Sequence, residues 1–343
     1  MPLSLQITKL VITLLMILGT WVSQAMPRPL LNAEAIAEKH EQWMARHGRT
    51  YHDNAEKERR FQIFKNNLDY IENFNKAFNK TYKLGLNKFS DLSEEEFVTT
   101  YNGYEMPTTL PTANTTVKPT FFSNYYNQDE VPESIDWREN GVVTSVKNQG
   151  ECGCCWAFSA VAAVEGIAGN GASLSAQQLL DCVGDNSGCG GGTMIKAFEY
   201  IVQNQGIVSD TDYPYEQTQE MCRSGSNVAA RITGYESVIQ SEEALKRAVA
   251  KQPISVAIDA SSGPNFKSYI SGVFSAEDCG THLTHAVTLV GYGTTEDGTK
   301  YWLVKNSWGE EWGESGYMRL QRDVGAMEGP CGIAMQASYP TLD

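Results

Sequence analysis

The sequence reads Gln149-Gly150-Glu151-Cys152-Gly153-Cys154-Cys155-Trp156-Ala157-Phe158-Ser159 where an apolar helix is predicted to begin. From Cys155 to Ile167, small, apolar and aromatic residues follow without a proline, which predicts a buried helix whose first residue is a cysteine. The N-terminus of a helix carries a partial positive charge, which stabilises a thiolate and lowers its pKa. Cys155 is therefore a candidate nucleophile. A structural thiol is the alternative, because most cysteines of secreted proteins are structural.

Strands are predicted further along the chain. The runs 254–258, 286–292 and 301–305 are short, rich in β-branched or aromatic residues, and flanked by glycine or polar residues. Helices first and strands later favour an α+β fold with two packed halves. Only two histidines follow Val131, namely His282 and His285, and either could hold the proton of a cysteine nucleophile as imidazolium.

Three motifs in one order resemble the papain-like cysteine proteases. After the Cys-Gly-x-Cys-Trp pattern around Cys155, His285 opens His-Ala-Val-Thr-Leu-Val-Gly-Tyr-Gly, 130 positions downstream. Asn306 opens Asn-Ser-Trp-Gly, 151 positions downstream of Cys155. In that family the histidine and the asparagine follow the cysteine at roughly 130–150 residues. The resemblance implies a two-domain α+β fold, with a helical domain, a β-barrel-like domain and the active-site cleft between them, preceded by a helical prodomain.

The resemblance also implies catalytic roles. Cys155 would attack the scissile carbonyl, His285 would carry the proton, and Asn306 would orient His285 with Trp308 shielding that contact. The Gln149 side chain and the Cys155 backbone N–H would form the oxyanion hole. His282 is expected to be a surface residue, because the family's Ala-Val motif follows His285 instead.

Substrate-binding positions follow from the same likeness. Gly191 and Gly192 match the strand that binds the substrate backbone, where a missing Cβ allows close approach. The pocket for the residue two positions before the cut is expected to be lined by Thr193, Met194, Ala257, Leu283 and Gln336. Apolar members favour Leu, Val or Phe there, while Gln336 at the pocket floor is polar. No occluding insertion is evident, which favours an endopeptidase.

All eight cysteines lie after residue 150, and counting alone does not say which of them pair. Family likeness implies three disulfides, Cys152–Cys189, Cys182–Cys222 and Cys279–Cys331. Cys154 is then unpaired, where relatives usually have a small residue without a thiol. Inert packing is the favoured interpretation and an oxidation-sensitive neighbour of the nucleophile is the alternative. Some plant members resemble this Gly-Cys-Cys-Trp form.

The chain is predicted to be made as a precursor. Residues 1–25 read as a signal peptide, because Lys9 precedes an apolar run from Leu10 to Val22 that is too short to span a bilayer comfortably. Residues 26–130 are expected to be an inhibitory propeptide with a linker, and residues 131–343 the mature peptidase. With no second long apolar stretch, no membrane anchor is expected.

The predicted propeptide contains two helices, over 36–47 and 56–76. One face of the second mixes charged, amide and apolar residues, which matches the helical signature of the family's propeptide; its members are Glu56, Arg60, Phe64, Asn67, Ile71 and Asn75. A second signature matches at Gly85, Asn87, Phe89 and Asp91. We expect this propeptide to inhibit the enzyme and to release it on acidification. Residues 106–118 form a polar linker, and Asn79 and Asn114 lie in glycosylation sequons.

Charge and composition limit the partners. The net charge is -14, and residues 131–343 hold 13 Lys+Arg against 26 Asp+Glu, so nucleic acid is not an expected partner. The expected partners are protein and peptide substrates and the propeptide itself, with a monomeric mature enzyme.

No cofactor or metal is expected, because a zinc site of Cys152, Cys154, Cys155 and the histidines conflicts with a disulfide framework. A silent relative with a binding or storage role is the other rival. Vacuole, lysosome and extracellular space are all compatible with the sequence.

Overall fold

The computed structural model describes residues 28–77, 80–106, 131–223 and 227–342. The predicted signal peptide, the asparagines of both sequons (Asn79 and Asn114) and the linker after Met106 lie outside these residues. The chain divides into two compact units, one ending at Asn66 and one beginning at Asn67. None of the described helices is both long enough and apolar enough to cross a membrane.

The first unit consists of α2 (Arg28–His47) and the first half of α3 (Asn54–Lys76). His40 and Trp43 of α2 pack on Phe64 of α3, with ring centroids 4.9 Å and 5.4 Å apart. Asp53 caps α3 by accepting a hydrogen bond from the Glu56 backbone N–H at 2.8 Å. Both predicted helices are present, and α2 begins eight residues before the predicted start at residue 36.

The second unit begins with the rest of α3, followed by β1 (Tyr82–Leu84) and α4 (Glu94–Tyr101). Two amides of the predicted polar stripe hold this region together. The Asn67 side chain donates to the backbone oxygens of Ser90 and Leu92, and Asn75 bonds both the N–H and the C=O of Leu84. These side chains satisfy backbone groups that no helix or sheet pairs, which explains polar residues on a half-buried helix face.

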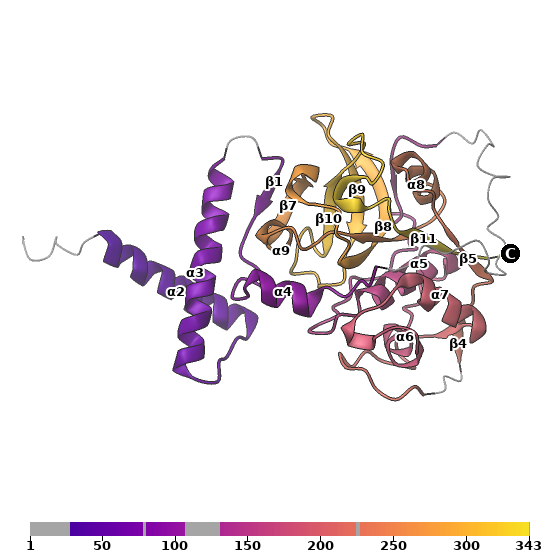
Figure 1. Cartoon of the computed structure of the whole chain (residues 1–343), viewed down its shortest axis with the longest axis horizontal. Helices are drawn as coiled ribbons and strands as arrows, with labels where there is room; N and C mark the ends of the chain where they lie inside the picture. The colour runs from indigo at the N-terminus through magenta and orange to yellow at the C-terminus, as the bar shows by residue number, and fades with distance from the viewer. Residues whose placement is uncertain (1–27, 78–79, 107–130, 224–226, 343) are drawn as a thin grey trace, which may run out of the picture. The chain divides into compact units, whose positions relative to one another are not determined.

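Helices and a small sheet form one half of residues 131–342, seen around α5, α6 and α7 in Figure 1. The helices are α5 (Cys155–Ala168), α6 (Ala176–Cys182) and α7 (Met194–Gln203), with a 3₁₀ turn, η1 (Gly188–Gly190). The strands β3 (Ile207–Val208) and β4 (Val228–Ala230) pair beside them. Ten of the fourteen residues of α5 are buried, as its apolar composition predicts.

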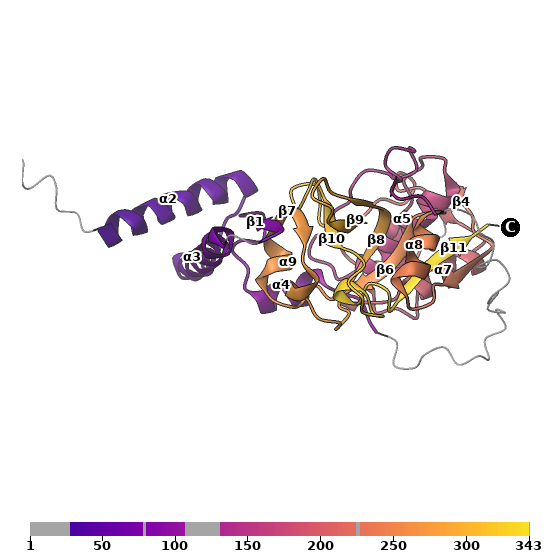
Figure 2. The same ribbon diagram turned by 90° about the horizontal axis from the view of Figure 1, so that it is seen from above.

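The other half is a mostly antiparallel sheet of nine strands, in the order β1-β7-β10-β9-β8-β6-β11-β5, with β2 beside β8. Its strands are β1, β2 (Ile135–Asp136), β5 (Gly234–Ser237), β6 (Ile254–Ile258), β7 (Tyr269–Phe274), β8 (His285–Thr294), β9 (Lys300–Lys305), β10 (Tyr317–Gln321) and β11 (Ala337–Thr341). The helices α8 (Glu242–Val249) and α9 (Pro264–Ser268) and the turns η2 (Ala276–Asp278) and η3 (Pro330–Gly332) complete it. Figure 2 shows β8 and β6 running beside one another.

The expected α+β class is confirmed, but the sheet does not close into a barrel. Within the described residues its path ends at β1 and β5, each of which pairs with one neighbour only. One edge strand, β1, comes from the predicted propeptide and pairs antiparallel with β7. The N-terminal segment 80–106, called the covering segment below, is therefore built into the sheet of the second unit.

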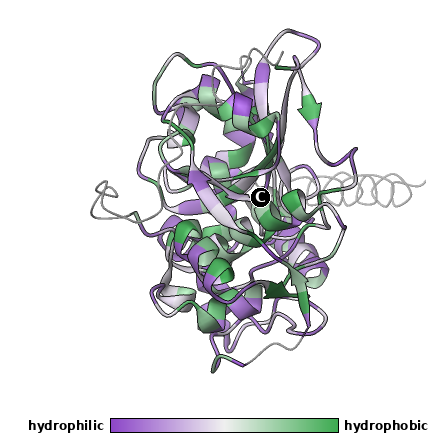
Figure 3. Cartoon of the chain, turned by 90° about the vertical axis from the view of Figure 1, so that its right-hand side faces the viewer, coloured by the Kyte–Doolittle hydropathy of each residue, from purple (hydrophilic) through white to green (hydrophobic). Residues whose placement is uncertain are grey.

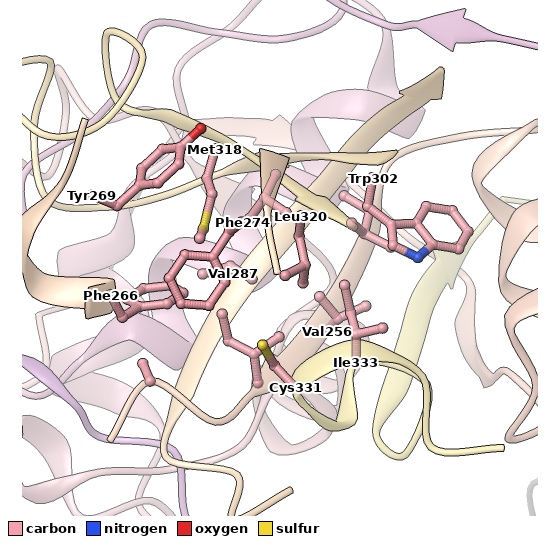
Figure 4. Packing of buried hydrophobic residues seen from close by; sticks show 14 of the residues in the cluster. Val256, Phe266, Tyr269, Phe274, Val287, Trp302, Met318, Leu320, Cys331 and Ile333 are labelled. Atoms are coloured by element: carbon pink, nitrogen blue, oxygen red, sulfur yellow. The ribbon is translucent and has the colours of Figure 1, made fainter. Parts of the chain in front are cut away.

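Figure 4 shows the core of the sheet half, where Phe266, Phe274, Trp302 and Leu320 meet from different elements. Hydrophobic and hydrophilic residues are interleaved along the helices and strands in Figure 3, as amphipathic elements require. Three disulfides are present, and they are the pairs that the resemblance implied: Cys152–Cys189, Cys182–Cys222 and Cys279–Cys331. They link residues 37, 40 and 52 positions apart, each worth about 4 kcal/mol in a chain-entropy description.

Candidate active site

Cys155 is the first residue of α5 and is fully buried. Its sulfur accepts a hydrogen bond from the backbone N–H of Ala286 at 3.3 Å. Ala286 is the second residue of β8, so the sulfur lies where the helical half meets the sheet half. This placement brings together the cysteine and the strand that begins with His285, although 130 residues separate them in the sequence.

His285 is held on one side by Asn306. Its Nε2 lies 2.8 Å from Asn306 Oδ1, and the same oxygen accepts the Ser307 backbone N–H at 2.8 Å. Because that backbone donor identifies Oδ1 as the oxygen, His285 carries its proton on Nε2, leaving Nδ1 as the basic nitrogen. Nδ1 is buried and has no hydrogen-bond partner among the described residues. Trp308 stacks on the imidazole with ring centroids 4.4 Å apart and so excludes water from this contact.

Gln149 is fully buried and its side-chain amide is oriented from both ends. Ser307 Oγ donates to Gln149 Oε1 at 2.7 Å, which identifies the other atom as the nitrogen. Nε2 then donates to the backbone oxygen of Cys152 at 2.9 Å and to that of Tyr101 at 3.0 Å. Tyr101 belongs to the covering segment, so one amide proton already binds a carbonyl oxygen within the cleft.

The C-terminal end of the covering segment, after α4, pairs as extended chain with Gly192. Tyr104 forms a parallel bridge with Gly192, with the Glu105 N–H donating to Gly192 O and the Gly192 N–H donating to Gly103 O. The N–H groups of Gly103 and Tyr104 both donate to Thr284 O, at 3.0 Å and 2.9 Å. A Cβ on Gly103 would lie 1.8 Å from the oxygen of Gly153, so only glycine fits beside the Cys154–Cys155 turn.

Aromatic packing fixes the same segment over the site. Phe89 and Phe97 meet Trp308 edge-on, with centroids 5.7 Å and 5.0 Å from its ring. The Asn87 side chain donates to Lys267 O at 2.8 Å, and Lys267, itself buried, donates to Leu92 O at 2.8 Å. The second propeptide signature therefore docks directly on the tryptophan that stacks on His285.

Burial under this segment controls the protonation of the pair. Desolvation raises the pKa of the Cys155 thiol to about 12, against the opposing hydrogen bonds from the N–H groups of Ala286, Trp156 and Gly103. Desolvation also lowers the pKa of His285 to about 4, although its hydrogen bond to Asn306 acts in the other direction. The backbone N–H groups at the start of α5 act to lower the Cys155 pKa, but burial outweighs them in this covered state, in which thiol and imidazole are both neutral.

A cavity of about 410 Å³ opens beside the covering segment. Thr193 and Met194 at the start of α7 line it together with Gln336, and these are three of the five residues predicted for the substrate pocket. Ala257 and Leu283 do not line it; they lie in the buried apolar cluster that also contains Tyr104. Tyr104 thus covers part of the predicted pocket.

Gly191 and Gly192, the two glycines of the predicted substrate strand, differ in which neighbouring atoms leave no room for a side chain. A Cβ on Gly191 would lie 2.9 Å from the Glu105 side chain and 3.1 Å from Gly103 O, so this position allows close approach of another chain. A Cβ on Gly192 would instead meet the Asn186 side chain at 2.4 Å. Asn186 bonds both the N–H and the C=O of Thr193, so Gly192 leaves room for a structural amide.

His282 is exposed, as expected, and only its backbone N–H is engaged, by Asp259. Within the described ranges no group of three or more His, Cys, Asp and Glu residues is arranged to hold a metal ion. Cys152 is bonded to Cys189, which removes it from any thiolate ligand set.

Comparison with known proteins identifies the family. A model of the papain family cysteine proteases matches residues 131–341. The chain belongs to the papain family of cysteine proteases. A second model, of the cathepsin propeptide inhibitor domain, matches residues 40–97. This papain-family chain is therefore a plant-type zymogen of a cysteine endopeptidase that carries its own propeptide inhibitor domain.

Relatives match over nearly the whole chain. The senescence-specific cysteine protease SAG12 of Arabidopsis thaliana is 46% identical over 328 residues, 93% of this chain and 94% of that protein. A solved structure of a recombinant stem bromelain precursor superposes with a TM-score of 0.82 at 47% identity, covering 90% of this chain and 99% of that one. The bromelain protease from Ananas comosus in complex with the E64 inhibitor has a TM-score of 0.60 at 52% identity, covering 62% of this chain and all of that one.

Three residues of the protease site were missed by sequence reasoning. Ser307 orients Gln149, Thr284 binds the covering segment, and Tyr215 donates to the backbone oxygen of Gln149 at 2.7 Å. Ser307 sits inside the Asn-Ser-Trp motif, so its place beside Asn306 was a usable signal. Thr284 directly precedes His285, which was a similar signal, whereas no motif marks Tyr215.

Proposed function

We propose that Cys155 and His285 form the nucleophile–base pair of this endopeptidase once the covering segment has left. Removing the segment exposes both groups to water and ends the desolvation that holds them neutral. The positive end of α5 and the N–H of Ala286 then favour the thiolate, and Asn306 favours the imidazolium. The tautomer supports this assignment, because His285 Nε2 is held by Asn306 and Nδ1 remains for the proton of the thiol.

In the proposed reaction the Cys155 thiolate attacks the scissile carbonyl carbon and a tetrahedral oxyanion forms. His285 donates its proton to the leaving amine as the C–N bond breaks, which leaves an acyl-enzyme. It then takes a proton from water, whose oxygen attacks the thioester, and returns the proton to the sulfur as the acid product leaves. Trp308 would keep the His285–Asn306 contact dry throughout.

Gln149 Nε2 and the Cys155 backbone N–H are proposed as the oxyanion donors. The single observation that carries the proposal is the 3.0 Å hydrogen bond from Gln149 Nε2 to the Tyr101 carbonyl oxygen in the covered cleft. An amide fixed from behind by Ser307 and directed at a peptide carbonyl is preorganised for a substrate carbonyl in the same cleft. Such a donor is worth roughly 3–4 kcal/mol to the transition state.

We further propose an apolar preference two residues before the cut, in the pocket formed by Thr193, Met194, Ala257, Leu283 and Gln336 once Tyr104 has left it. The covering segment supports this, because the bridge partner of Gly192 is an aromatic residue that buries itself in the apolar cluster with Ala257 and Leu283. We also propose that the mature enzyme begins near Val131 and is a monomer. It would be made through the secretory pathway and act in a vacuole or outside the cell.

The test compares Cys155→Ser with Cys154→Ser in the mature enzyme. Cys155→Ser should lower kcat by at least about a thousandfold while the melting temperature stays near that of the wild type. Cys154→Ser should retain most activity, since the hydroxyl is close to the thiol in size and in hydrogen bonding. Equal losses in the two variants, or substantial turnover by Cys155→Ser, would overturn the assignment.

A further inference from the structure

The unpaired thiol of Cys154 is part of a hydrogen-bond chain that ends on Gln149. Cys154 Sγ lies 3.0 Å from Tyr215 Oη, and Tyr215 Oη lies 2.7 Å from the backbone oxygen of Gln149. The Tyr215 ring packs edge-on against Phe158 of α5, with centroids 4.9 Å apart. Cys154 is fully buried and Tyr215 is half-buried, so the thiol end of this chain is shielded from water.

The direction of the chain follows from its ends. A carbonyl oxygen only accepts, so the single hydroxyl proton of Tyr215 is donated to Gln149 O. Tyr215 Oη can then only accept from Cys154, which must keep its proton to do so. Burial provides for this, because it raises the pKa of the Cys154 thiol to about 12. The order is therefore S–H to O–H to O=C, in which each bond polarises the next.

The Gln149–Gly150 peptide is the point at which this chain acts. Gly150 has φ +59°, and a Cβ there would lie 1.9 Å from the Oε1 of Gln217, two residues after Tyr215. The loop carrying Tyr215 is thus seated directly on this peptide. On the other side of the Gln149 Cα, in the preceding peptide, the Gln149 backbone N–H donates to Ser307 O at 2.8 Å.

We propose that Tyr215, held by the Cys154 thiol, is a positioning residue that fixes the backbone of Gln149 and thereby aims its side-chain amide into the oxyanion hole. Ser307 sets the rotation of that amide, and Tyr215 sets the peptide from which the side chain starts. The second cysteine of the Gly-Cys-Cys-Trp motif is then a hydrogen-bond donor to the catalytic machinery rather than inert packing. This inference rests on the proposed role of Gln149 as oxyanion donor.

The test is a double-mutant cycle on the mature enzyme with Tyr215→Phe, Gln149→Ala and the pair together. Tyr215→Phe should lower kcat about tenfold, as for loss of one buried hydrogen bond, with KM within about twofold. Gln149→Ala should lower kcat about 100- to 1,000-fold. Adding Tyr215→Phe to Gln149→Ala should then cost nothing more, because the donor it positions is absent. Tyr200→Phe, a half-buried tyrosine bonded to Gln178, is the matched control and should leave kcat unchanged.

The thiol is tested by conservative rescue. Cys154→Ala should lower kcat about threefold or more, and Cys154→Ser, which restores a donor, should return it to near the wild-type value. The pH profile of Cys155 alkylation by iodoacetamide should be the same in all of these variants, which separates positioning of Gln149 from damage to the nucleophile. If Tyr215→Phe does not fold, this pair of Cys154 variants still decides the matter.

The outcomes are distinguishable. If Gln149→Ala lowers kcat but Tyr215→Phe has no effect, or has the same effect with and without Gln149, the positioning role is wrong and the oxyanion role stands. If Gln149→Ala leaves kcat unchanged, the oxyanion role fails and the positioning role fails with it. An altered alkylation profile in Tyr215→Phe would also overturn the positioning role, since it would place the effect on Cys155.

Discussion

Replacing Phe89 by alanine should make the covering segment leave the site more often. Phe89 is 0% exposed and its ring meets Tyr101, Phe97 and Trp308 at centroid distances of 4.7, 5.2 and 5.7 Å. Replacing a fully buried phenylalanine by alanine costs about 3–5 kcal/mol. The cost falls on the covered state alone, because a displaced segment leaves this side chain in water. The equilibrium constant for opening should therefore rise about 150- to 5,000-fold.

The assay is alkylation of Cys155 by iodoacetamide in the intact proenzyme at pH 7, followed by peptide mass analysis. In the covered state burial raises the pKa of the thiol to about 12, so the thiol form dominates at this pH. Alkylation then proceeds through transient opening, and its rate reports the opening equilibrium. Phe89→Ala should raise that rate by the factor given above, up to the rate of the open enzyme.

Lys88→Ala is the control, because it keeps the Phe89 ring and removes only peripheral contacts of the same segment, the 3.0 Å hydrogen bond to Asn148 and the Lys88 ammonium 5.0 Å from the centroid of that ring. Its alkylation rate should stay within about threefold of the wild type. A Phe89→Ala rate equally close to the wild type would refute the reasoning, since it would mean that the aromatic contact with Trp308 does not hold the segment in place.

Three further predictions concern the mature enzyme and the acid response of the proenzyme. Asn306→Ala should lower kcat at least about tenfold with little change in KM, measured with a peptide amide, because the His285 ring loses the acceptor that fixes its tautomer; an unchanged kcat would remove Asn306 from the mechanism. Peptides with Leu or Phe two residues before the cut should be hydrolysed with a higher kcat/KM than those with Arg or Lys. Equal kcat/KM values would show that the proposed pocket, with Gln336 at its floor, does not select apolar residues. The pKa of Glu56 is lowered to about 2 by its ion pairs with the two following arginines of α3, so the stability they give is present above pH about 4.5 and lost as pH falls towards 2. Glu56→Gln should flatten the rise in autoactivation rate over that range, and a rise as steep as in the wild type would exclude this cluster as the acid trigger.

Acidification acts in opposite directions on different carboxyls of the propeptide. Burial raises the pKa of Glu94, although Lys267 lies 3.8 Å away and opposes the shift. A carboxyl with a raised pKa favours the covered state as it is protonated, so Glu94 does not contribute to acid release. The expected release must therefore come from groups with lowered values, such as Glu56.

Local structure could be predicted well from the sequence. The helix at Cys155 and the strands near 254–258, 286–292 and 301–305 are present within one or two residues at either end. Each of these segments is rich in apolar residues because it is buried, so its residue pattern indicates both its secondary structure and its burial. The early start of α2 was missed: the helix was predicted from Ile36, whereas α2 begins at Arg28.

Long-range arrangement could not be predicted in the same way. The pairing of β1 with β7 joins Tyr82 to Gly272, and no local pattern encodes a partner 190 residues away. The same limit applies to the site, where the motifs marked Cys155 and His285 but not Tyr215. The protonation state of Cys155 in the covered state could not be predicted either, because the helix terminus is a local feature whereas burial depends on a segment distant in the sequence.

Labelling of the mature enzyme with an epoxide inhibitor of cysteine proteases tests the central claim most directly. One equivalent should abolish activity, and peptide mapping should place the adduct on the sulfur of Cys155, the thiol at the start of α5. Neither Cys154 nor any disulfide cysteine should be modified. An adduct on Cys154, or complete inactivation without an adduct on Cys155, would contradict the assignment of Cys155 as the nucleophile.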